Sequence, residues 1–216
     1  MKISKAFPGM SSPAAGFDEP FEMLASCHDR IRRSLALLGR LCAHVREHGA
    51  DGQAATAADD VLRYFSIAAP QHHQDEERHV VPMLRRLGDA QSIATADRIV
   101  TDHARFHAAW AVLEPQLRAL ELAHRSASTS EVGPASDAGA FGAIGALEAS
   151  AHAFIEMHTA HLALEEAVAF PAAARVVTRQ GDAALRAMGA EMATRRGTPN
   201  TGSTESIQAP SPDPGS

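Results

Sequence analysis

The chain has 216 residues, of which 45% are hydrophobic and 21% are charged, so it is long enough for one ordinary domain with a buried core. A formal net charge of -6 and the absence of an evident basic stripe argue against a protein that binds nucleic acid through its phosphates. The sequence contains no apolar run suited to a signal peptide or a bilayer span, so we expect a cytoplasmic protein that does not enter a membrane.

The first half of the chain predicts two long helices, because apolar residues recur there at alternating spacings of three and four. The first helix begins after Asp18 and ends near residues 49–52. The second runs from about residue 53 to residue 87, where Gly88 stops it. Pro70 lies inside this second helix and is expected to kink it.

The second half predicts two further long helices and a shorter one. The third helix carries an apolar stripe over 99–120, with a bend expected at Pro115. Small and polar residues over 126–139 predict a loop, after which the fourth helix carries its stripe from residue 147 towards Pro171. A weaker helical pattern covers roughly 182–196.

No segment shows the period-two alternation of a half-buried strand, so the predicted fold is all-α. Short connections between the first three helices make neighbours antiparallel, which predicts an up-down-up-down four-helix bundle with a short extra C-terminal helix. The expected division is a flexible arm over 1–17, the bundle over 18–176, the extra helix over 177–196 and a disordered tail over 197–216.

Four histidines interrupt the apolar stripes, one on each long helix: His28, His72, His103 and His161. Residues equidistant from the turn of an antiparallel hairpin lie at the same height, because both arms rise equally per residue. The midpoints between successive histidines fall near residues 50, 88 and 132, and all three are in predicted turns. The four imidazoles should therefore share one layer of the core.

Two copies of one motif supply carboxylates to this layer. The stretches HHQDEERHVVP, from His72, and HLALEEAVAFP, from His161, each place a Glu four residues after the His and a Pro ten residues after it. Glu76 and Glu165 then lie on the same face as their histidines. Four imidazoles and two carboxylates able to bridge are suited to two closely spaced ions, with iron favoured by the ligand chemistry and manganese or zinc as alternatives.

Other side chains near this layer have open roles. His73 and Glu77 form a second pair at the same spacing, but the position of the Pro selects His72 and Glu76. Glu166 is the alternative to its neighbour as a ligand. His107 and His158 are each a possible further ligand or an outer donor, since each lies one turn from a histidine of the layer.

The set of motifs resembles the hemerythrin-like, HHE cation-binding family over roughly residues 18–176. The matching segments are CHDRIRR, HHQDEERHVVPML, DHARFHAAW and HLALEEAVAFPAA. The resemblance implies a four-helix bundle around a non-haem di-iron centre, with ligands at His28, His72, Glu76, His103, His161 and Glu165. The Glu at the last position looks more like bacterial relatives linked to nitric oxide response and iron-sulfur repair than like oxygen carriers.

The sequence thus predicts a di-iron protein that binds dioxygen or nitric oxide, in sensing, binding or iron handling. Trp110, two turns from His103 on the same stripe, should help to wall the ligand pocket. The alternatives are a di-iron oxidase or peroxidase, and an iron-sulfur repair or nitrosative stress protein. The sequence indicates no particular protein partner.

Overall fold

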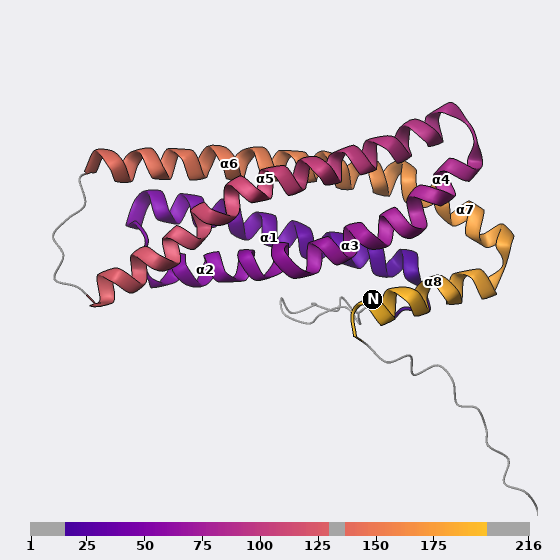
Figure 1. Ribbon diagram of the computed structural model, residues 1–216, viewed down its shortest axis with the longest axis horizontal. Coiled ribbons are helices and arrows are strands. Elements are labelled where there is room, and N and C mark those ends of the chain that lie inside the picture. Colours follow the sequence, from indigo (N-terminus) through magenta and orange to yellow (C-terminus); the bar gives the residue numbers. More distant parts are fainter. Residues whose placement is uncertain (1–15, 130–136, 198–216) are drawn as a thin grey trace, which may run out of the picture.

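The computed structural model describes residues 16–129 and 137–197, and within them the chain is helical without strands. Four arms run up and down beside one another, and an additional helix covers one end (Figure 1). The elements in chain order are α1 (Pro20–His48), α2 (Gly52–Arg63), η1 (Tyr64–Ala68), α3 (Ala69–Asp75), η2 (Glu76–Val80), α4 (Val81–Leu87), α5 (Ala90–Thr129), α6 (Asp137–Leu164), η3 (Glu165–Ala169), α7 (Phe170–Gln180) and α8 (Asp182–Arg195). The predicted all-α bundle is confirmed.

Local sequence sets the turns between the arms. The Asp51 side chain accepts a hydrogen bond from the Ala54 backbone at 2.8 Å and caps α2. Gly88 ends α4 in the left-handed conformation with φ of 76°, which a residue without Cβ adopts readily. The loop predicted over 126–139 is wrong at both ends, because α5 continues to Thr129 and α6 begins at Asp137. Side chains of small residues permit helix as well as loop, which is why composition alone misplaced these ends.

Three short π-helical turns interrupt two of the four arms of the bundle. The second arm consists of α2, η1, α3, η2 and α4, and the fourth consists of α6, η3 and α7. Each π-helical turn comes just before a proline. Proline has no backbone N–H to donate to the preceding turn. In η2 the residue before Pro82 donates instead to the carbonyl of Glu76, five positions back, and the residue before Pro171 donates likewise to Glu165. The kink expected at Pro70 is therefore realised as a π-helical turn within a continuous arm.

The core consists of two apolar clusters with a polar layer between them. One surrounds Leu38, Phe65 and Phe154, and the other surrounds Leu84 and Ile99. Along α1, Cys27 belongs to the second cluster and Ile31 to the first, so His28 lies at the boundary. The apolar packing that stabilises the bundle thus holds the histidine layer from both sides.

The end of the bundle is covered by α8, which follows α7 after Gly181, at φ of 89°. The predicted boundary at residue 176 falls inside α7, which continues to Gln180 because Val176 and Val177 are buried in the core. A Cβ on Gly189 would lie 1.7 Å from the carbonyl oxygen of Phe17, so only glycine permits this contact.

A buried ion pair ties α8 to the second arm. Asp75 is fully buried, and Arg195 Nε donates to its Oδ1 at 2.7 Å. Arg196 pairs with its other oxygen. The C-terminal helix is therefore joined to the residue that precedes Glu76.

Phe17 also packs against this end of the core, so packed structure includes the last residue of the predicted arm over 1–17. The remainder of that arm, up to residue 15, lies outside the described residues, as does the predicted tail beyond Gly197. Among the described helices, none combines the length and the apolar character needed to cross a membrane.

Candidate metal centre

Six side chains from all four arms meet in the polar layer. They are His28 of α1, His72 of α3, Glu76 of η2, His103 of α5, His161 of α6 and Glu165 of η3. Each is at most 1% exposed. The structure thus brings together the full set that the height argument and the repeated motif selected.

The six residues form two groups that share both carboxylates. His28 and His72 complete one group and His103 and His161 complete the other, and within each group the ligand atoms lie within 4.8 Å of one another. Two groups with common carboxylates are the arrangement expected for two adjacent ions bridged by carboxylate. A single closed tetrahedral site would need only four of these side chains.

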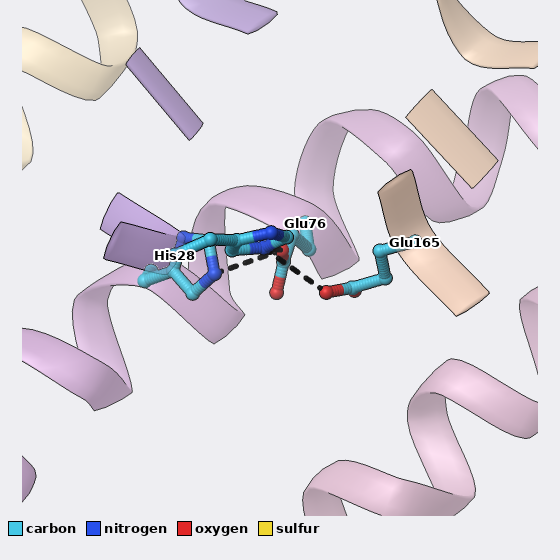
Figure 2. Close-up of side chains that lie close together, drawn as sticks. His28, Glu76 and Glu165 are labelled. Atoms are coloured by element: carbon cyan, nitrogen blue, oxygen red, sulfur yellow. Dashed lines mark ion pairs between the residues drawn. The ribbon is translucent and has the colours of Figure 1, made fainter. Parts of the chain in front are cut away.

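The carboxylate oxygens divide between the two groups. Glu76 Oε1 lies 3.0 Å from His72 Nε2, while its Oε2 lies 3.4 Å from His103 Nε2. The fourth arm repeats this pattern, with Glu165 Oε1 at 3.1 Å from His161 Nε2 and Oε2 at 3.3 Å from His28 Nε2. Figure 2 shows His28 with the two glutamates, whose carboxylates face each other. Each carboxylate therefore reaches across from its own helix to a histidine of the other group.

Several inward atoms of this cluster have no hydrogen-bond partner among the described residues. They include Nε2 of His28 and of His72 and both carboxylate oxygens of Glu76 and of Glu165. Buried polar atoms of this kind are costly unless something satisfies them. Two cations coordinated by mixed nitrogen and oxygen donors would satisfy them together, so the residues present fit a dinuclear centre.

A second set of carboxylates holds the outer nitrogens of the histidines. His28 Nδ1 lies 2.9 Å from Glu166 Oε1, and Arg32 donates to the other oxygen of Glu166 at 2.7 Å. His103 Nδ1 lies 2.8 Å from Glu77 Oε1. An Nδ1–H that donates outwards leaves the Nε2 lone pair facing the centre. Glu166, the alternative ligand in the sequence analysis, thus lies outside both groups.

His161 has a looser outer partner. Its Nδ1 lies 3.6 Å from Asp102 Oδ2, and Arg98 Nε donates to that carboxylate at 2.7 Å. Asp102 is buried and directly precedes His103 in the chain, but the sequence analysis did not single it out. The sequence did offer one indication of this role, because Asp102 is an acidic residue directly beside the candidate ligand His103 on the same helix.

Proximity of carboxylates governs the charge state of the layer in the metal-free protein. Burial by itself would lower the pKa of His28, but the carboxylates of Glu165 and Glu76 raise it to about 9. Burial opposes the charge of His103 too, yet Glu76 raises its pKa above the ordinary value. Burial would raise the pKa of Glu76, whereas His72 and its other imidazole neighbours lower it. Metal ions loading this site must therefore displace protons.

Most of the chain matches a known family. A family model described as the Hemerythrin HHE cation binding domain matches residues 19–173. The chain belongs to this family. An uncharacterized protein of Haemophilus influenzae (strain ATCC 51907 / DSM 11121 / KW20 / Rd) is 33% identical over 106 residues, which cover 49% of this chain and 61% of that protein. The match therefore spans less than two thirds of the relative's length.

A cavity of about 340 Å³ lies beside the candidate metal centre of the HHE domain. Aromatic residues form much of its wall, and Trp110 is among them. His73 also lines it and stacks on His103, with ring centroids 4.2 Å apart and 19° between the planes. The cavity therefore reaches a side chain in direct contact with a candidate ligand.

The two histidines left open by the sequence line this cavity but belong to neither donor group. His107 is exposed, on a face of α5 that turns away from the layer. His158 is 1% exposed, and its Nδ1 donates to the Phe154 carbonyl at 2.9 Å. Burial lowers the pKa of His158 to about 3, so this imidazole is neutral.

Proposed function

We propose that this HHE domain holds two iron ions and binds dioxygen or nitric oxide at them. The arrangement that supports this proposal is the pair of donor groups with Glu76 and Glu165 in common. The proposed ligands are His28, His72, Glu76, His103, His161 and Glu165. When bound, the iron pair would supply the electrons and the open coordination position that a diatomic ligand needs.

The protein's own residues would hold and orient this centre. Glu166 and Glu77 accept hydrogen bonds from the Nδ1–H groups of His28 and His103, which fixes the tautomer and directs each Nε2 inwards. The apolar clusters on both sides exclude water from the layer. The cavity lined by His73, which stacks on His103, provides space for a small molecule beside the layer.

The donor set supports iron and leaves manganese and zinc as the alternatives. Imidazole and carboxylate suit all three ions, whereas thiolate is absent from both groups. Structural zinc sites are usually closed with four ligands, while the two shared glutamates would allow higher coordination numbers here. Membership of the cation-binding family agrees with a metal role and does not select the ion.

A second candidate function is oxidation of a small organic substrate or decomposition of peroxide at the same centre. The cavity volume of about 340 Å³ favours this alternative, because it lies within the range of small-molecule sites and exceeds what a diatomic molecule requires. Reversible ligand binding without product would count against it.

The test is metal analysis of protein purified anaerobically, followed by optical spectra on exposure to dioxygen and to nitric oxide. We expect two irons per chain and a reversible charge-transfer band. The double variant Glu76→Ala, Glu165→Ala should lose dinuclear loading, since it removes both bridges. A matched double variant of exposed glutamates, Glu47→Ala with Glu156→Ala, should retain it. Two ions per chain in the first variant would contradict the assignment of the bridges.

A further inference from the structure

A groove of about 700 Å³ lies on the outer surface between α1 and the segment formed by α2 and η1. These elements run side by side in the bundle (Figure 1). The arginines that line the groove are Arg30, Arg33, Arg40 and Arg63. No basic stripe was expected from the sequence, yet three of these arginines, spaced by three and seven residues, share one face of α1, and the fourth comes from α2.

Most of this positive charge is not neutralised locally. Arg63 pairs with Asp60 and, at 3.4 Å, with Asp59. Arg30, Arg33 and Arg40 are exposed and have no acidic partner within residues 16–129 and 137–197. The chain as a whole carries a net charge of -6. The three unpaired arginines therefore make this groove positively charged on an otherwise acidic protein.

The same groove contains exposed apolar surface. Positions 30, 33, 37 and 40 follow one face of α1, so Leu37 lies among the arginines. Ile67 contributes from the opposite wall and is 58% exposed. Tyr64 and Ala68 complete the lining on that side. A surface that combines unpaired arginines with apolar side chains matches a ligand that is both acidic and apolar.

We propose that the arginine groove, lined by Arg30, Arg33, Arg40, Leu37 and Ile67, binds an acidic amphipathic segment of a partner protein. Carboxylates of the partner would pair with the three arginines, and an apolar side chain would cover Leu37 and Ile67. Arginine is suited to this role because its planar guanidinium pairs with carboxylate in two-pronged fashion.

Other occupants match the groove less well. A simple polyanion would use the arginines but leave the apolar surface in water. Nucleic acid presents many phosphates along its length, whereas this groove offers three unpaired arginines, and its apolar walls would stay in water. A second copy of this acidic chain is the remaining possibility, and the dependence of binding on protein concentration distinguishes it.

The groove is linked by one hydrogen bond to the segment that carries His28. The Tyr64 hydroxyl donates to the Cys27 carbonyl at 3.4 Å, and Cys27 is the residue before His28. A partner bound in the groove would therefore contact a side chain that is hydrogen-bonded to the residue before His28, a proposed metal ligand. This link alone depends on the proposed function, whereas the docking site itself requires no metal.

The only tyrosine in the chain provides a direct probe of the groove. Full-length protein labelled with 3-fluorotyrosine should give a single ¹⁹F resonance, reporting on Tyr64. We expect a short synthetic peptide of Glu and Leu residues to shift this resonance, with an affinity that falls as salt is added. Replacing its Glu residues by Gln, or its Leu residues by Ala, should weaken binding.

Variants then test the assignment of the arginines. The triple variant Arg30→Gln, Arg33→Gln, Arg40→Gln should bind the peptide about tenfold more weakly, as expected for three exposed ion pairs. The matched control replaces three exposed arginines of α4 and α7, Arg86, Arg175 and Arg179, by Gln and should bind normally. Both variants should keep the metal content of the parent, so failure of docking is distinguishable from failure of the metal proposal.

Three outcomes would overturn the proposal. The first is an unchanged Tyr64 resonance at all peptide concentrations. The second is equal binding of inorganic polyphosphate and of the peptide with Ala in place of Leu, which would indicate a general anion site. The third is a shift that depends on protein concentration without peptide and disappears in the Arg30, Arg33, Arg40 variant, which would indicate self-association.

Discussion

Removal of metal should reverse the way in which the stability of this HHE domain depends on pH. In the metal-free protein His28 is fully buried, and its pKa is raised from 6.5 to about 9 because Glu165 and Glu76 outweigh the effect of burial. A histidine whose pKa is higher in the folded than in the unfolded chain stabilises the fold fully below the unfolded value. This contribution is lost as pH rises through the folded value.

The size of the effect follows from the pKa of His28. A change from 6.5 to about 9 corresponds to about 3 kcal/mol, of which about 2 kcal/mol is lost between pH 6 and 8.5. The Tm of a chain of this size changes by roughly 2–4 °C per kcal/mol. From His28 alone, the Tm of the metal-free protein should therefore fall by about 4–8 °C over this range. The loaded protein should instead gain stability as pH rises, because protons compete with metal for the imidazoles.

The assay is thermal unfolding followed by far-ultraviolet circular dichroism, on chelator-treated and on metal-loaded protein. The upper limit of pH 8.5 keeps the measurement at or below the ordinary pKa of a cysteine thiol. The double variant Glu76→Gln, Glu165→Gln removes the cause of the raised pKa and leaves only the effect of burial, so its metal-free Tm should no longer fall as pH rises. A wild-type metal-free Tm that stays constant or rises from pH 6 to 8.5 would refute the reasoning.

Three further substitutions test the surroundings of the centre. Glu166→Ala removes the hydrogen-bond acceptor of His28 Nδ1 and should weaken metal affinity by roughly 10- to 100-fold, as measured by competition with a chelator. Unchanged affinity would show that this contact does not orient His28. His107→Ala should leave two ions per chain by metal analysis, since this exposed residue belongs to neither donor group, and loss of an ion would restore it as a ligand. Arg195→Met leaves the buried Asp75 short of a partner and should lower the free energy of unfolding of the metal-free protein by about 2–4 kcal/mol, as measured by urea denaturation. A change near zero would mean that Arg196 alone suffices to pair with Asp75.

The sequence predicted the six members of the layer because two regular geometries determine them. Equal rise along antiparallel arms sets which histidines share a height, and spacing of four on a helix sets that His72 and Glu76 share a face. Both rules depend only on position in the chain. The structure accordingly brings these side chains together without any adjustment of the predicted register.

Contacts that depend on which helices are neighbours were beyond the same reasoning. Glu166 reaches His28 from the fourth arm to the first, and Asp75 meets Arg195 from the C-terminal helix. Height along the bundle predicts neither contact, since each also requires the rotation of the helices about their axes. Sequence spacing already places Arg30, Arg33 and Arg40 on one face of α1, but the second wall of the groove comes from α2 and η1 and depends on how the helices pack.

The repeated proline now has a physical explanation that the ligands alone do not provide. Pro82 and Pro171 cannot donate to the preceding turn, so a π-helical turn starts at Glu76 and at Glu165. A wider turn shifts the residues that follow relative to a regular α-helix. Each arm can therefore keep its His and Glu on the inward face and still return apolar residues such as Val80 to the cluster beyond. The repeat thus encodes a change of helical phase as well as two ligands.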